Sequence, residues 1–200
     1  MKKLSLVSLA VVSILVLSAC GTPPQDYVTP PPGSITEFVP AQFPTDYNHS
    51  FNIKYPSQDT FETGGDTDSY SASWIKDKNG KVIVTILDNT LIGCPASKPG
   101  CGIDEAVVMT PAQIYEQGRK NYDNDKGFVA TEPVTALAKE LVNVNVYTGV
   151  SEDTKEEVLI YLINTGTGVV QVTFAEPKKL GEAFIADIVR SITPNAKSTK

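Results

Sequence analysis

Val158-Leu159-Ile160-Tyr161-Leu162-Ile163 is the stretch from which the fold of this chain is best predicted. An unbroken apolar run of this length, rich in β-branched and aromatic residues, favours a strand that is buried on both faces. Thr165-Gly166-Thr167-Gly168 follows and favours a tight turn into Val169–Phe174. The two stretches therefore predict an antiparallel hairpin, with Val158–Ile163 central in the sheet.

Other stretches of the chain are also predicted to be strands. Asn79-Gly80 favours a tight hairpin between two of them. Gln58–Ser69, in contrast, is polar and glycine-rich and is expected to be a loop. The predicted strands are Phe51–Tyr55, which stops at Pro56, Tyr70–Lys76, Val82–Leu87, Phe128–Val134 and Val142–Val146.

Two helices are predicted. Thr110-Pro111-Ala112-Gln113 has the pattern of a capping box with proline at the first helical position, and Gly127 is the expected C-terminal stop. Gly118 lies on the apolar side of this helix and allows a close approach to the sheet. Lys178–Ile192 carries a continuous apolar stripe and is followed by Pro194, so it is expected to form one helix.

The order of these elements defines the fold class. Hairpins connect most of the strands, and hairpins produce antiparallel pairs. Two amphipathic helices can cover such a sheet on one face or on both. The sequence therefore predicts an α+β domain with an antiparallel β-sheet and two main helices, and it argues against a doubly wound nucleotide-binding fold.

The N-terminus has the pattern of an export signal. Lys2 and Lys3 precede the uncharged segment Leu4–Ala19, whose sixteen residues would extend roughly 24 Å as a helix, less than a membrane span requires. Leu17-Ser18-Ala19-Cys20 resembles the lipobox of bacterial lipoproteins. The resemblance implies cleavage after Ala19, lipid attachment to Cys20 with acyl chains such as palmitate, and anchorage in the cell envelope with the domain facing the periplasm or the exterior. An ordinary signal peptide with a chance cysteine is the alternative.

The segment after Cys20 is expected to be a linker. Half of the fourteen prolines lie between Gly21 and Tyr47, and proline-rich chain is stiff and extended. The expected organisation is a signal peptide at residues 1–19, a lipidated proline-rich linker at 20–47, a globular domain at 48–194 and a disordered tail at 195–200.

Cysteine and charge content restrict the chemistry. Cys94 and Cys101 are close in sequence, and in an exported protein such a pair favours a disulfide, with a redox-active pair or two reduced thiols as alternatives. A zinc site is disfavoured because the chain has one histidine. A net charge of −6, without any basic run, argues against nucleic acid and against binding of anionic lipid by charge. Membrane attachment is therefore expected through the lipid on Cys20.

Three stretches resemble the Mog1/PsbP-like family, which has an α/β/α sandwich fold. Phe51-Asn52-Ile53-Lys54-Tyr55-Pro56 resembles the opening strand of the family, and Phe184–Ile192 resembles its closing helix. Pro111–Asp125 matches the middle helix in position. Members of this family mostly bind partners and share no catalytic constellation, so the resemblance implies a binding domain and carries over no functional residue.

Candidate catalytic and metal-binding residues are few. His49 is the single histidine and lies at the expected start of the domain, which makes it a poor catalytic base. Ser73-Trp74-Ile75-Lys76 matches S-x-x-K, but on a strand the serine and the lysine would point to opposite faces. Asp123–Gly127 lacks the ligand pattern of a calcium loop. Asp66 and Asp68 are the best candidates for weak cation binding, with solvated loop carboxylates as the alternative.

The function predicted from the sequence is non-catalytic: a lipid-anchored envelope domain that binds a protein or another envelope component. No cofactor, metal or catalytic residue is predicted. The alternative is a hydrolase, for example one acting on glycans, which would need a cleft with two carboxylates at a suitable distance.

Overall fold

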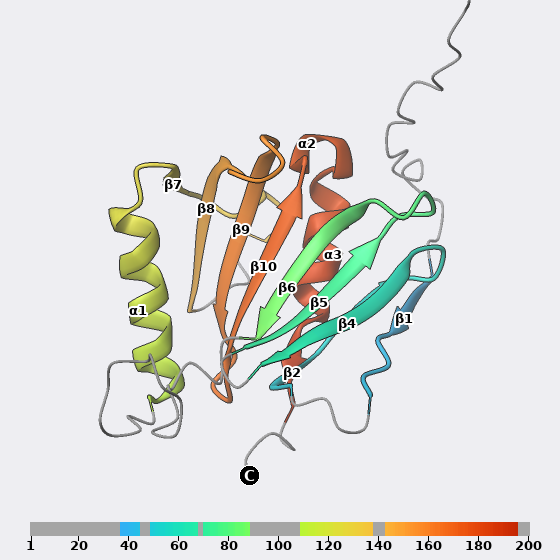
Figure 1. Ribbon diagram of the computed structural model, residues 1–200, viewed down its shortest axis with the longest axis horizontal. Coiled ribbons are helices and arrows are strands. Elements are labelled where there is room, and N and C mark those ends of the chain that lie inside the picture. The colour runs from blue at the N-terminus through green and yellow to red at the C-terminus, as the bar shows by residue number, and fades with distance from the viewer. Residues whose placement is uncertain (1–36, 45–48, 68–69, 89–108, 138–142, 196–200) are drawn as a thin grey trace, which may run out of the picture.

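The computed structural model describes residues 37–44, 49–67, 70–88, 109–137 and 143–195 of the chain. Its main feature is a seven-stranded sheet with the order β4-β5-β6-β10-β9-β8-β7 (Figure 1). Every pairing between these strands is antiparallel, and two helices of seven or more residues accompany them. The α+β prediction is confirmed. The strands are β4 Thr60–Thr67, β5 Tyr70–Lys76, β6 Val82–Asp88, β7 Phe128–Thr131, β8 Val144–Val150, β9 Glu157–Asn164 and β10 Val169–Ala175.

The path of the chain explains this strand order. β4, β5 and β6 form one run of hairpins, and helix α1 (Pro111–Asn124) then leads to β7 at the opposite edge. From β7 the chain returns by hairpins through β8 and β9 to β10, which pairs with β6 and closes the sheet. The predicted β9–β10 hairpin is therefore confirmed. β10, with three strands on either side, is the middle strand, and β9 lies next to it.

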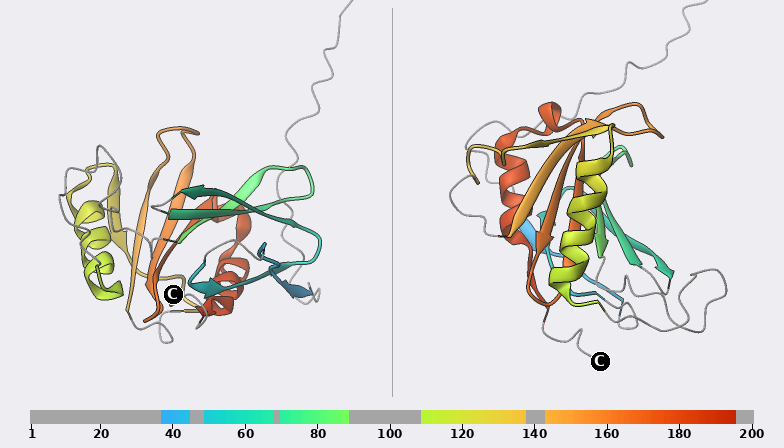
Figure 2. Two further views of the ribbon diagram at one scale, coloured as in Figure 1. Left: turned by 60° about the horizontal axis from the view of Figure 1, so that its bottom comes forward. Right: turned by 90° about the vertical axis from the view of Figure 1, so that its left-hand side faces the viewer.

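The two longer helices lie on opposite faces of the sheet (Figure 2). Helix α3 (Glu182–Ser191) covers the face to which Ile86, Val172 and Tyr161 belong, three residues that are neighbours across β6, β10 and β9. These side chains form the main core together with Phe184 and other residues of α3. Because side chains alternate between the faces of a strand, the intervening residues point to the other helix.

Helix α1 covers part of that second face. Ile114 packs with Leu162 and Val169, and a Cβ added at Gly118 would lie 3.1 Å from a methyl group of Leu162. The close approach predicted for Gly118 is therefore confirmed. The main contacts of α1 run to β7, β9 and β10.

The capping of α1 agrees with the prediction at its start and differs at its end. The Thr110 side chain accepts a hydrogen bond from the Gln113 amide, and the Gln113 side chain accepts one from the Thr110 amide. The helix ends at Asn124, and Asp125 has extended dihedral angles. The prediction that Gly127 caps the helix was wrong. The carboxylate of Asp125 instead accepts the Gly127 amide at 2.8 Å and turns the chain into β7.

The helix predicted over Lys178–Ile192 is broken. A single turn, α2 (Pro177–Leu180), precedes α3, and Gly181 between them has φ of 80°. This left-handed conformation is readily accessible only to glycine, and it reorients the chain. The residues of the apolar stripe are nevertheless buried on both sides of the break, because Leu180 and Phe184 lie in the same core.

The predicted loop at 58–69 is largely a strand. β4 pairs with β5 from Thr60 opposite Lys76, and its register shifts between Gly64 and Thr67. A Cβ on Gly64 would lie 2.9 Å from the ring of Trp74, so glycine lets this ring lie over the strand. The polar sequence of this segment did not indicate a strand, and the strand forms because the segment pairs with β5.

The folded part of the chain begins earlier than expected. Phe51–Tyr55 is divided into two short strands: β2 (Phe51–Asn52) pairs with β11 (Thr193–Pro194), and β3 (Lys54–Pro56) pairs with β1 (Phe38–Pro40). β1 lies within the expected linker 20–47, so the strand pairing of the folded part extends ahead of residue 48, where the globular domain was expected to begin. Alternation alone could not reveal that one stretch serves two partners.

Candidate functional site

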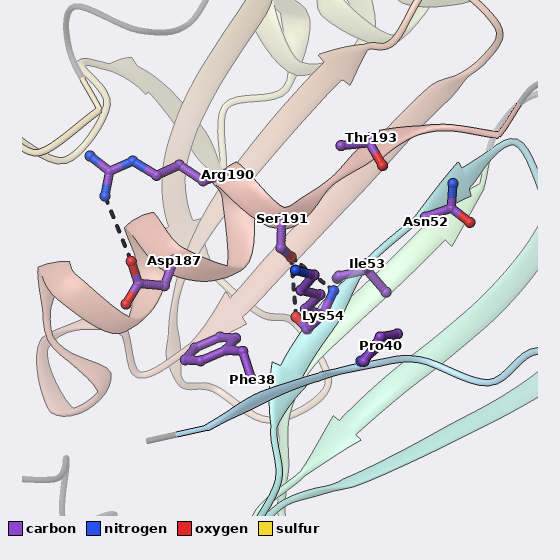
Figure 3. A pocket seen from close by; sticks show the side chains of 9 residues that line it. All are labelled: Phe38, Pro40, Asn52, Ile53, Lys54, Asp187, Arg190, Ser191 and Thr193. Atoms are coloured by element: carbon purple, nitrogen blue, oxygen red, sulfur yellow. Dashed lines mark hydrogen bonds and ion pairs between the residues drawn. The ribbon is translucent and has the colours of Figure 1, made fainter. Parts of the chain in front are cut away.

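A groove of about 420 Å³ lies between β1, β2–β3 and the end of α3 (Figure 3). We call it the α3 groove. Its apolar side chains include Phe38 and the buried Ile53, whereas Lys54, Asp187 and Arg190 are exposed. The nine lining residues are Phe38, Pro40, Asn52, Ile53, Lys54, Asp187, Arg190, Ser191 and Thr193.

Ser191 joins the two sides of the α3 groove. Its hydroxyl oxygen accepts the Lys54 amide hydrogen at 3.0 Å and lies 3.1 Å from the Lys54 carbonyl oxygen and 2.7 Å from that of Ile188. At the end of the groove, the Asn52 side chain donates to the Pro194 carbonyl at 3.2 Å. The walls are therefore held by polar contacts between segments far apart in sequence.

The two basic side chains at the groove, Arg190 and Lys54, differ in their bonding partners. The Arg190 guanidinium donates to the Ala136 carbonyl at 2.8 Å and lies 3.6 Å from the Asp187 carboxylate. Within the described residues, the Lys54 ammonium has no hydrogen bond or ion pair. The groove of this acidic protein thus presents a lysine that is available to an anionic group.

Two smaller hollows differ in chemistry. A crevice of about 240 Å³ between α1 and the sheet is lined by amide and apolar side chains, among them Gln117 and Leu162; it also contains Tyr122, whose pKa is raised to about 12 mainly by burial. A hollow of about 330 Å³ near α2 is lined by lysine and glutamate side chains, several of which pair with one another, as Lys179 does with Glu176. Neither combines an apolar floor with an available charge.

A buried acidic pair lies outside these hollows. Asp59 is 8% exposed and Asp77 is 5% exposed. Burial, and secondarily the charge of Asp77, raises the pKa of Asp59 from 3.8 to about 6. Oδ2 of Asp59 has no hydrogen-bond partner among the described residues.

Most residues singled out from the sequence fall outside this groove. Cys20, Cys94, Cys101 and Asp68 lie outside the described residues, so lipidation and the disulfide stay predictions. Asp66 lies in β4 and not in the loop that was expected for it. The structure does not test cation binding by Asp66 and Asp68.

The candidate catalytic residues are not brought together. His49 stacks on Phe43 with ring centroids 3.9 Å apart. Ser73 is buried, whereas Lys76 pairs with Glu62 at 2.5 Å, as expected if the two lie on opposite faces of β5. Asp123 forms an ion pair with Arg119 at 2.7 Å. It belongs to the segment Asp123–Gly127, which lacks the ligand pattern of a calcium loop.

The parts of the chain that the structure describes contain no group of three or more histidine, cysteine, aspartate or glutamate residues placed to hold a metal ion. None of their helices is long and apolar enough to cross a membrane.

Comparison with known proteins identifies no relative. No family model, no curated protein and no solved structure matches this chain.

The groove itself was not predicted. Phe38 and Pro40 were assigned to the linker, and Asp59 to a loop. A signal was nevertheless present, because two stretches that the sequence analysis singled out, Phe51–Pro56 and Phe184–Ile192, together supply most of the residues that line the groove. Their contact through Ser191 could not be read from either stretch alone.

Proposed function

We propose that this protein is an envelope lipoprotein, anchored by lipid on Cys20, whose domain binds a protein or envelope component through the α3 groove. The observation that carries the proposal is the combination of an apolar floor, Phe38 and Ile53, with the available ammonium of Lys54. Apolar contacts with a few well-placed polar groups are typical of binding sites. A ligand with an apolar group next to an anionic group fits this arrangement.

The layer order supports the family proposed from the sequence. α1 and α3 cover opposite faces of an antiparallel sheet, as an α/β/α sandwich of the Mog1/PsbP-like kind requires. Binding of partners, the role of most of that family, is in keeping with the groove.

The hydrolase alternative has less support. A glycosidase needs two carboxylates several ångströms apart on either side of its substrate. Asp187 is the one carboxylate among the described residues that line the α3 groove, and Arg190 lies beside it. Asp59 and Asp77 are a pair, but both are buried.

The anchor is tested with Cys20→Ala. Cells fed labelled palmitate should label the wild-type chain, and the label should be lost in the variant. The wild type should partition into the detergent phase of a Triton X-114 extract, since two or three acyl chains anchor a protein stably. A labelled Cys20→Ala protein would refute lipidation at this residue without bearing on the groove.

The groove is tested by photo-crosslinking of the full chain in cells. A photoreactive benzoylphenylalanine at Asn52 should form discrete adducts, whereas the same residue at Lys120, exposed on α1, should not. Lys54→Glu should reduce the Asn52 adducts at least fivefold, because it replaces the available cation with an anion. Identical adducts at both positions, or Asn52 adducts insensitive to Lys54→Glu, would exclude the groove as the binding site.

A further inference from the structure

Asp59 and Asp77 lie at the open end of the β4–β5 hairpin, one residue before and one residue after its last paired residues. Thr60 is opposite Lys76 in the register, and continuing this register by one residue would bring Asp59 opposite Asp77. Directly opposite residues of an antiparallel pair have Cβ atoms about 4.5–5.5 Å apart. Both residues are less than a tenth exposed, so water screens their charges weakly.

The two carboxylates have different hydrogen-bond environments. Oδ1 of Asp77 accepts the amides of Asn79 and Lys81, both at 2.9 Å. Oδ2 of Asp77 has a single long contact, 3.4 Å from the Asn79 side-chain nitrogen. Oδ2 of Asp59 has no partner in the described part of the chain. Oδ2 of Asp59 therefore lacks a hydrogen-bond donor, and Oδ2 of Asp77 is able to accept a further hydrogen bond.

The surrounding charges do not neutralise this pair. Lys76 is bound to Glu62, and the Lys81 ammonium is bound to Glu156 and Glu176. Asp77 is the one charged neighbour that shifts the pKa of Asp59, and it shifts it upward. The remaining charged residues on the adjoining elements are exposed: Glu37 before β1, Lys54 on β3 and Lys78 on the β5–β6 turn.

The backbone connects Asp59 to the α3 groove. The Asp59 amide donates to the Pro56 carbonyl at 3.0 Å, which closes the turn after β3. In the same turn, the Ser57 amide donates to the Glu37 carbonyl at 2.8 Å, and Pro56 is paired with Phe38 on β1. Phe38 lines the groove, so the turn that carries Asp59 also holds one groove wall.

We propose that Asp59 carries a proton that holds the Pro56–Asp59 turn against the β4–β5 hairpin, and that loss of this proton loosens the β1 wall of the α3 groove. In the protonated state the Asp59 hydroxyl donates to Oδ2 of Asp77. On deprotonation the proton goes to solvent, and the two carboxylates repel one another. The inference does not require the groove to bind a partner.

The sign of the pH dependence follows from the direction of the shift. Because the pKa of Asp59 is raised on folding, from 3.8 to about 6, the neutral form stabilises the fold. This contribution is fully present below pH 3.8 and is lost as the pH rises through about 6. Linkage predicts a roughly tenfold fall in the folding equilibrium constant between about pH 5 and 7 from this residue.

The test uses the full chain in detergent and hydrogen exchange, corrected for the intrinsic effect of pH. Protection factors of the Ala41 and Ser57 amides, which bond across β1 and β3, should fall several-fold between about pH 5 and 7 in the wild type. Asp59→Asn keeps a donor and has no charge, so these protection factors should not change with pH. Asp153→Asn, at an exposed turn position, is the control and should behave as the wild type.

Two results would overturn the inference. One is an equal pH dependence in wild type and Asp59→Asn; the other is a fall in the protection of the β9 and β10 amides while that of the Ala41 and Ser57 amides stays unchanged. If Asp59→Asn fails to fold, carbon-detected NMR titration of the wild-type Asp59 carboxyl decides the matter. A titration midpoint above pH 5 supports the proton on Asp59, and a midpoint near 3.8, the ordinary value, refutes it.

Discussion

Tyr147 and Tyr161 show how individual buried hydroxyls of this protein are satisfied. The Tyr147 hydroxyl donates to the Asp123 carboxylate at 3.1 Å; burial and this bond raise its pKa to about 12. The Tyr161 hydroxyl accepts the Val134 amide at 3.0 Å, and burial raises its pKa too. The Tyr147 hydroxyl donates to a carboxylate that has another partner, whereas the Tyr161 hydroxyl accepts a hydrogen bond from a backbone amide.

This difference predicts unequal costs of removing the two hydroxyls. Tyr161→Phe leaves the Val134 amide without its acceptor and should lower the free energy of unfolding by about 1–3 kcal/mol. Tyr147→Phe should cost about 1 kcal/mol, because Asp123 keeps its ion pair with Arg119. Urea unfolding of both variants at one pH measures the difference. A larger loss for Tyr147→Phe would contradict this account.

Gly149 is a second residue whose environment leads to a prediction. A Cβ there would lie 2.5 Å from Cδ1 of Phe128 and 2.6 Å from the Gly127 carbonyl oxygen. Because one of these atoms belongs to the backbone, Gly149→Ala should destabilise the protein by about 2–3 kcal/mol and displace β7 from β8. Gly166→Ala, where the added Cβ would have open space, should cost about 1 kcal/mol from its positive φ alone. Thermal unfolding that ranks the two variants in the reverse order would exclude the clash.

At the scale of elements, the end of α3 is bound to the N-terminal strands by one side chain. Ser191 contacts both backbone polar groups of Lys54, while β11 pairs with β2 immediately beyond the helix. β1 pairs with β3 and β2 pairs with β11, and Phe51 and Ile53 lie in the core that α3 helps to form. The position of these short strands, and with it the shape of the α3 groove, therefore depends in part on α3.

Ser191→Ala should weaken this attachment. We expect a loss of about 1–2 kcal/mol in the free energy of unfolding, because the Lys54 amide loses its acceptor. Exchange of the Lys54 amide should accelerate while the amides of β9 and β10 stay protected. Ser57→Ala, at an exposed position, is the matched control and should change stability by less than about 0.5 kcal/mol. Equal effects of the two substitutions would remove Ser191 from this role.

At the scale of the whole molecule, an ion network joins three connections at one end of the sheet. Lys81, beside the β5–β6 turn, pairs with Glu156 before β9 and with Glu176 after β10; Glu176 also pairs with Lys179 of α2 at 2.6 Å. Hydrogen bonds from Lys179 and Lys81 lower the pKa of Glu176. The network thus links the two halves of the sheet from outside the core.

The pH dependence of this network is opposite in sign to that of Asp59. A lowered pKa means that the stabilisation is present above the ordinary value of 4.5 and is lost as the pH falls below it. Lys81→Met should cost less than about 1 kcal/mol at neutral pH, since the groups are partly exposed. The difference from wild type should shrink in high salt and at pH 3. Urea unfolding at several pH values measures it, and a constant difference would show that packing of the lysine stem is responsible.

The predicted Cys94–Cys101 disulfide would also act on the whole molecule, because both residues lie in sequence between β6 and α1. Closure of so short a loop is expected to stabilise the fold by roughly 2–3 kcal/mol. The purified chain should gain about 2 Da on reduction under denaturing conditions, and a Cys94→Ser/Cys101→Ser variant should melt at a lower temperature. An unchanged mass on reduction would show that the thiols are free.

The amino-acid sequence by itself predicted the features that depend on local interactions. An unbroken apolar run and the turn residues after it identified the β9–β10 hairpin, and the capping pattern identified the first residue of α1. It also predicted the fold class, because connected hairpins can form only antiparallel pairs. These signals lie within a few residues of one another, so one stretch is enough to read them.

Tertiary structure alone decided which distant segments meet. β4 is a strand because β5 pairs with it, Phe51–Pro56 is divided because β11 and β1 pair with different parts of it, and Gly181 breaks the last helix although its apolar stripe continues. The α3 groove and the Asp59–Asp77 pair arise in the same way. Each is formed by residues whose contact depends on packing of the whole chain, and no local pattern in the sequence records that contact.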